Sequence, residues 1–113
     1  MSLRFHLRVN QGETFQLAIP VLDENDDPVS LSGMGARGQI RAFAASPTAL
    51  YEWSTTNGNL SFDGANVVIT IPATASSAWT FRSGEYAVEL ADADGNVSRL
   101  LDGQVIIHPE VVR

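Results

Sequence analysis

The chain has 113 residues, a formal net charge of −6, 44% apolar residues and no cysteine. This length and composition predict a single folded domain over residues 1–113 and exclude disorder. The lack of cysteine excludes a disulfide scaffold, a thiolate zinc site and a cysteine nucleophile. The acidic balance argues against nucleic acid and anionic membranes as partners, because both attract basic surfaces.

The first residues alternate between polar and apolar types and contain no apolar run of signal-peptide length. No stretch approaches the roughly 18 apolar residues of a transmembrane helix. We therefore expect synthesis in the cytoplasm without a signal peptide. All seven basic residues are arginine, the basic residue that protein interfaces favour over lysine.

Alternation of apolar and polar residues along most of the chain predicts antiparallel strands with one buried face. In chain order they cover 3–9, 15–21, 36–43, 50–53, 60–62 and 67–71, followed by a long hairpin over 84–112 with its turn at 92–96. In the first strand Leu3, Phe5, Leu7 and Val9 form the buried face, and Ile40 points inward in the third. About two helical turns over 73–79, with Thr74 as N-cap, connect one sheet to the other.

Several single residues refine this picture. Pro20 cannot donate a ladder hydrogen bond, so its strand lies at a sheet edge or is bulged there. Gly103 inside the last strand predicts a bulge or bend. Tyr86 opens the penultimate strand, where the tyrosine of immunoglobulin domains bonds back to the preceding corner. Trp53 or Trp79 supplies the large buried ring.

The number and spacing of these elements predict an all-β fold. We expect an immunoglobulin-like antiparallel β-sandwich of about seven or eight strands with one short helical crossover.

The sequence offers no catalytic, cofactor-binding or metal-binding constellation. The acidic turn with Asp23, Asp26 and Asp27 has the carboxylates that calcium prefers, but it reads as a solvated turn. The two histidines, His6 and His108, lie far apart, and no nucleophile elbow accompanies them. We therefore expect a protein that is not an enzyme and has no cofactor or metal.

The end of the chain carries a resemblance to a known family. Its residues are Gly84-Glu85-Tyr86, Val88-Glu89-Leu90, Asp94-Gly95-Asn96-Val97, Arg99-Leu100-Leu101, Gly103 and Pro109-Glu110-Val111-Val112-Arg113. This pattern resembles a family of small phage and prophage proteins that are tail- or baseplate-associated and similar to the N-terminal domains of baseplate upper proteins. Looser matches lie at 15–22, 31–33 and 36–41. The resemblance implies an immunoglobulin-like virion module, structural or adaptor in role, that contacts other virion proteins and has no catalytic residues.

Two functions therefore compete. In the first, arginines on the first and third predicted strands, Arg4, Arg8, Arg37 and Arg41, dock the module onto an acidic copy of itself or another tail component, as a ring or small symmetric oligomer. In the second, a carbohydrate-binding module for host recognition uses Tyr51 and Trp53, two residues apart on one strand face, as an aromatic platform. The alternative is that Tyr51 and Trp53 pack in the core, since aromatic side chains bury a large area.

Overall fold

The computed structural model describes residues 3–109 of the chain. Within that range it contains nine strands and one short helix. The elements are β1 (Leu3–Arg4), β2 (Leu7–Asn10), β3 (Phe15–Pro20), β4 (Gly35–Arg41), β5 (Ala49–Ser54), β6 (Leu60–Asp63), β7 (Asn66–Ile71), α1 (Ala73–Ser77), β8 (Ser83–Ala91) and β9 (Val97–His108). The fold is thus mostly β. No helix among these residues is both long and apolar enough to cross a membrane.

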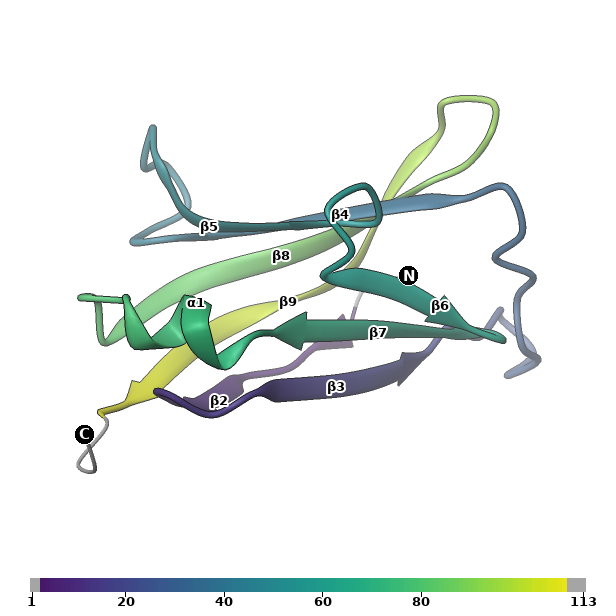
Figure 1. Cartoon of the computed structure of the whole chain (residues 1–113). Coiled ribbons are helices and arrows are strands. Elements are labelled where there is room, and N and C mark those ends of the chain that lie inside the picture. The colour runs from purple at the N-terminus through teal and green to yellow at the C-terminus, as the bar shows by residue number, and fades with distance from the viewer. Residues whose placement is uncertain (1–2, 110–113) are drawn as a thin grey trace.

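The strands form two sheets that lie over one another (Figure 1). The larger sheet has six strands in the order β1-β9-β8-β4-β5, and β2 also pairs with β9. The smaller sheet has three strands in the order β3-β7-β6. The helix α1 connects β7 of the small sheet to β8 of the large one, as the sequence predicted. This is an all-β architecture of two layers, as in a β-sandwich.

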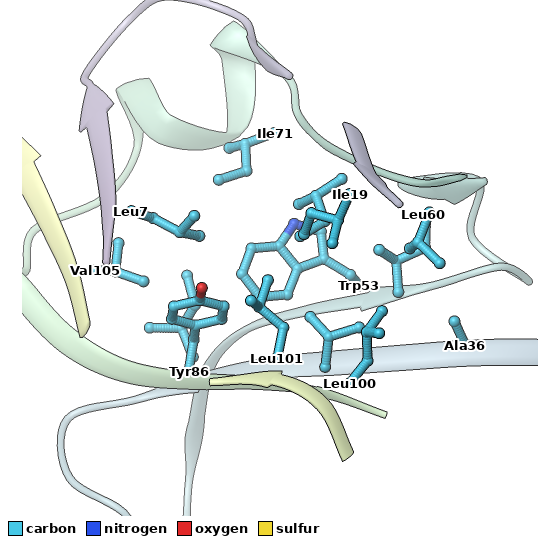
Figure 2. Close-up of a cluster of buried hydrophobic side chains, with 14 of the residues drawn as sticks. Leu7, Ile19, Ala36, Trp53, Leu60, Ile71, Tyr86, Leu100, Leu101 and Val105 are labelled. Atoms are coloured by element: carbon cyan, nitrogen blue, oxygen red, sulfur yellow. The ribbon is translucent and has the colours of Figure 1, made fainter. Parts of the chain in front are cut away.

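The inward side chains of both sheets enclose one apolar core (Figure 2). In β7, for example, Val67, Ile69 and Ile71 are fully buried and alternate with partly exposed residues. The ring of Trp53 lies in this core, and Gly38 on the neighbouring strand makes room for it. A Cβ atom on Gly38 would lie 3.0 Å from Cε3 of Trp53, which is closer than most real contacts.

Several expectations are confirmed. The two hairpins form, with turns at 64–65 and 92–96, and Ile40 is buried. Pro20 ends β3, which is an edge strand because it pairs only with β7. Trp53 and Trp79 are both buried, so both tryptophans supply a large buried ring where one was expected.

Other expectations are wrong. The sandwich is not wholly antiparallel, because β1 and β2 pair with β9 in parallel, and residues 3–109 contain nine strands instead of seven or eight. The first strand is not continuous: it breaks at Phe5 and His6, and Phe5 is 49% exposed. The bulge expected at Gly103 is absent there, because Gly103 pairs with Tyr86 in regular register and the register shift lies between Val88 and Glu89. The break between β1 and β2 does lie opposite Gly103. The helix begins directly after Pro72, which leaves Thr74 within the helix, exposed and without an N-cap role.

Candidate interaction face

A groove of about 690 Å³ lies on the outer face of the large sheet. Side chains of β1, β4, β8 and β9 line it, together with Ala44 of the loop between β4 and β5. We call it the charged groove, after its charged lining residues Arg4, Arg37, Arg41, Glu85, Glu89, Arg99 and Asp102. It therefore collects four of the chain's seven arginines against three carboxylates, although the whole chain is acidic.

The strand register places these opposite charges across from one another. Glu89 of β8 pairs with Arg37 on one side and with Arg99 on the other. In a parallel pairing, Arg4 of β1 stands opposite Asp102 of β9. Opposite charges on neighbouring strands stabilise a sheet face modestly. Ala87, which stands opposite Gln39 and Asp102, also lines the groove and contributes only a small side chain.

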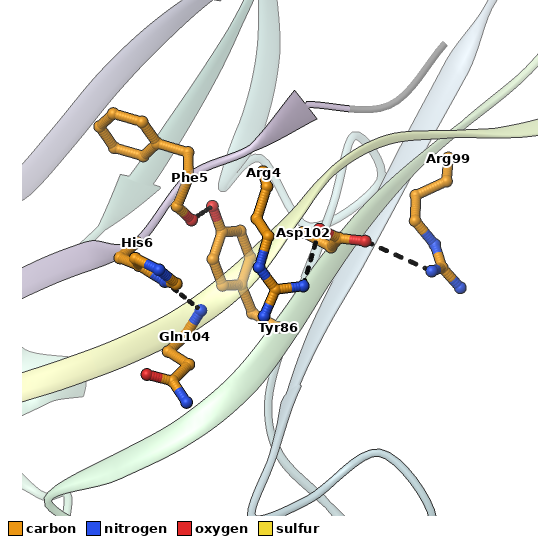
Figure 3. A network of polar contacts seen from close by, with 7 residues as sticks. All are labelled: Arg4, Phe5, His6, Tyr86, Arg99, Asp102 and Gln104. Atoms are coloured by element: carbon orange, nitrogen blue, oxygen red, sulfur yellow. Dashed lines mark hydrogen bonds and ion pairs between the residues drawn. The ribbon is translucent and has the colours of Figure 1, made fainter.

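The ion pairs in the groove are loose. Arg37 Nε lies 3.3 Å from Glu89 Oε1. Asp102 accepts from Arg99 Nη1 at 3.4 Å and forms an ion pair with Arg4 Nη1 at 3.8 Å (Figure 3). The three arginine side chains are 58–74% exposed, whereas the two carboxylate side chains are 24–34% exposed. The guanidinium groups thus stand above the carboxylates. These arginine side chains are therefore more accessible to a partner than the carboxylates with which they pair.

Arg41 has a different task from the other three arginines. Its Nη1 donates to the carbonyl oxygen of Ser46 at 2.6 Å, and its Nη2 donates to Gln39 Oε1 at 2.8 Å. Glu85 accepts a bond from the backbone N–H of Ala44 at 2.7 Å. These bonds fix the loop between β4 and β5 against the sheet, so this loop forms a firm wall of the groove.

A polar network holds the broken edge strand at the other side of the groove (Figure 3). The Tyr86 hydroxyl donates to the carbonyl oxygen of Phe5 at 2.6 Å, and the Phe5 N–H donates to the carbonyl oxygen of Asp102 at 2.8 Å. The backbone N–H of Gln104 donates to Nδ1 of His6 at 3.1 Å, where a regular strand would offer a carbonyl group. The expected bond from Tyr86 to the preceding corner is therefore wrong. Burial, reinforced by the negative charge of Asp102, raises the pKa of the Tyr86 phenol well above its usual value.

The four predicted interface arginines do not all come together. Arg4, Arg37 and Arg41 line the charged groove, although Arg4 lies on β1 and the other two lie on β4, which is not its neighbour in the sheet. Arg8 is exposed on β2 and lies outside the groove lining. Sequence reasoning missed Arg99, Glu85, Glu89 and Asp102. The alternation in β8 indicated that its glutamates share a face, but nothing in the sequence gave the register against β4 and β9.

The predicted aromatic platform does not form. Trp53 is 1% exposed, and Tyr51 is half-buried with its ring edge-to-face against Trp53 at 5.5 Å. Tyr51 also packs against Trp79 at 5.2 Å, and its hydroxyl accepts a bond from Asn59 Nδ2. Burial raises the pKa of Tyr51, while the bond from Asn59 opposes that shift. A ring buried in the core cannot stack on a sugar, so the platform prediction is wrong and the core reading holds.

The acidic turn is organised by one of its own carboxylates. Asp23 Oδ1 accepts the backbone N–H groups of Asn25 at 2.8 Å and Asp27 at 3.0 Å. The turn between β8 and β9 repeats this pattern, with Asp92 Oδ1 accepting from Asp94 and Asn96. In residues 3–109 no three His, Cys, Asp or Glu side chains are grouped as metal ligands.

No protein-family model matches this chain, and no curated protein matches it either. The resemblance to small phage proteins therefore rests on the residues quoted for it. Of these, Glu110, Val111, Val112 and Arg113 lie outside the described residues.

Proposed function

We propose that this chain is a non-catalytic structural or adaptor module of a phage or prophage virion, part of the tail or baseplate, that works by binding other proteins. The observation that carries the binding role is the charged groove, where exposed arginines stand above partly buried carboxylates on a sheet face. Interfaces favour arginine because its planar guanidinium group pairs with carboxylates and stacks on other groups. The virion setting rests on the resemblance carried by the β8–β9 hairpin.

We propose further that the two sheets belong to the immunoglobulin-like class. What supports this is the strand order. Taking β3 to β9 as strands B, C, C′, D, E, F and G, the large sheet contains C′-C-F-G and the small one contains B-E-D. The departures are that β1 and β2 pair with the last strand, and that the buried Trp53 comes from β5 instead of β4.

The test of this function is the location of the protein in particles. Particles released from the strain that encodes the chain are purified on a density gradient, and tails are separated from heads. We expect peptides of this chain in the tail fraction, and deletion of its gene to leave particles with incomplete tails. Particles that lack the chain and stay infectious after its deletion would refute the proposal.

No observation favours the carbohydrate-binding alternative, because the aromatic pair on which it was predicted is in the core. Binding of the folded protein to a glycan array would restore it.

A further inference from the structure

We propose that the charged groove of one copy receives the acidic turn of a second copy, so that the protein assembles head to tail. The acidic turn is residues 23–27, between β3 and β4. This inference rests on the proposed function, because it names the partner that the groove binds. It adds a specific occupant and a specific geometry to that function.

The arginines of the groove have N–H donors left over for the carboxylates of a partner. Arg4, Arg37 and Arg99 are each mostly exposed, and each ion pair within the groove uses one guanidinium nitrogen, Nη1 or Nε. The remaining nitrogens of each group point to no acceptor within residues 3–109 that would hold them. A guanidinium group has five N–H donors and binds a second carboxylate without giving up the first.

The acidic turn presents carboxylates in a fixed shape. The carboxylate of Asp23 accepts hydrogen bonds from backbone N–H groups of the turn itself. The backbone N–H of Asp26 donates to the Asp23 carbonyl oxygen at 3.0 Å. Glu24, Asp26 and Asp27 are exposed, and the ion pairs found within residues 3–109 involve none of them. Because the turn is ordered by its own bonds, little conformational entropy is lost when a partner binds it.

The two similar turns differ in the number of carboxylates that they leave free for a partner. In the turn between β8 and β9, Asp92 has the same structural role as Asp23. Only Asp94 is then left to contact a partner there, against three carboxylates in the acidic turn. Charge complementarity with a groove of several arginines therefore favours residues 23–27.

The positions of the two surfaces set the form of the assembly. The acidic turn follows the end of β3 and lies at one end of the molecule (Figure 1). The groove instead lies on the outer face of the large sheet. The contact joins two different surfaces, so it is heterologous and generates a ring or an open chain of subunits. One turn in one groove is a small interface, and such interfaces are weak. Assembly should therefore appear only at high protein concentration.

The experiment uses two variants that each lose one half of the contact. In the groove variant, Arg37→Gln/Arg99→Gln removes two exposed charges and leaves Arg41 to hold its loop. In the turn variant, Glu24→Lys/Asp27→Lys reverses two charges and leaves Asp23 to order the turn. Arg8→Gln and Asp94→Lys are the matched controls, because both residues are exposed and lie outside the proposed contact. Circular dichroism and a thermal melt check that every variant is folded.

Light scattering after size exclusion gives the mass of each sample at about 0.05 M salt. We expect the wild type and both controls to increase in mass with concentration, and each contact variant to remain a monomer. An equimolar mixture of the two contact variants should form a one-to-one dimer, since one supplies an intact turn and the other an intact groove. Salt at about 0.5 M should dissociate all of these species, because it shortens the screening length severalfold.

Three outcomes would overturn the inference. The first is a wild type that stays monomeric at about millimolar concentration, where weak interfaces of this size are populated. The second is assembly that both contact variants retain. The third is a wild-type groove that binds heparin, a polyanionic glycan, but does not bind the turn of a second copy. None of these outcomes removes the chain from purified tails, so the proposed function is judged separately.

Discussion

The hydroxyl of Tyr86 donates a hydrogen bond to the backbone carbonyl oxygen of Phe5 over 2.6 Å, and 81 positions separate the two residues in the chain. This bond ties the broken first strand to the centre of the large sheet. It forms where β1 ends and β2 has not yet begun, so it replaces a ladder bond that the break removes. The charged groove borders the same place, since Arg4 and Asp102 flank it.

Replacing Tyr86 by Phe should lower the free energy of unfolding. A lost hydrogen bond costs about 0.5–1.5 kcal/mol, and about 1–3 kcal/mol where the remaining partner stays buried and unpaired. Urea denaturation measures the change. The control is Tyr51→Phe, whose hydroxyl accepts from the side chain of Asn59 in the loop between β5 and β6. Its loss should matter less, because it does not tie one strand of the sheet to another. Equal midpoints for wild type and Tyr86→Phe would show that the bond does not hold the edge strand.

The raised pKa of Tyr86 predicts a loss of stability in alkali. The folded state keeps the phenol neutral, whereas in the unfolded chain it ionises near its usual value of 10.0. Its contribution is therefore complete below about pH 10 and falls as the pH rises further, because the unfolded state then binds fewer protons than the folded state. The chain contains no lysine, so few other groups titrate in this range. Unfolding free energies from pH 8 to 11 should fall less for Tyr86→Phe than for wild type, and parallel curves would contradict the shift.

Gly103→Ala should destabilise the fold strongly. An added Cβ atom would overlap the carbonyl oxygen of Phe5, a backbone atom that cannot move aside without breaking the bond from Tyr86. Overpacking of this kind costs about 1–3 kcal/mol. Gly64→Ala is the control, because Gly64 has a φ of 61° and no atom within 4 Å of the added Cβ, so only the backbone conformation opposes the change. A melting temperature for Gly103→Ala no lower than that of Gly64→Ala would argue against the close approach.

Asp92 should stabilise the β8–β9 turn in a pH-dependent manner. Bonds from the backbone and side chain of Asn96, aided by those from Asp94 and Gly95, lower the pKa of Asp92 below its usual 3.8. Its stabilising effect is present above that usual value and is lost as the pH falls through the lowered pKa. Asp92→Ala should reduce the melting temperature at neutral pH, with the difference from wild type shrinking toward pH 2. Asp94→Ala should have little effect at any pH, and an equal loss from both variants would refute this role.

Calcium should not stabilise the protein. Asp23 is occupied by backbone N–H groups, which leaves the acidic turn without a convergent set of ligands. A site at a free calcium concentration 100-fold above its dissociation constant would add about 2.7 kcal/mol to the unfolding free energy. Thermal melts with millimolar calcium and with a chelator should coincide, and a clear rise with calcium would restore a metal site at Asp23, Asp26 and Asp27.

Much of the β architecture could be predicted from local pattern. The alternation of Val67, Ile69 and Ile71 and the Asp-Gly turns define the hairpins, because strand periodicity and turn chemistry are properties of neighbouring residues. The same holds for Pro20, which lacks an N–H group and so belongs at an edge. The grouping of Arg37 with Arg41 on one strand face was also visible, since residues two or four apart share a face.

What the sequence by itself determined was therefore the all-β class, the hairpins and, for strands such as β4 and β7, the side that faces the core. Only the tertiary structure decided which strands lie side by side. The parallel pairing of β1 and β2 with β9 brings Arg4 to Arg99 and Asp102, and the register of β8 sets Glu89 between Arg37 and Arg99. The pairing of the strands also placed Phe5 outside the core, where its carbonyl oxygen approaches Gly103. It placed Trp53 inside the core, where Gly38 leaves space for the ring. Pairing between segments that are distant in the chain depends on the fit of whole sheets, and no local pattern of residues encodes that fit.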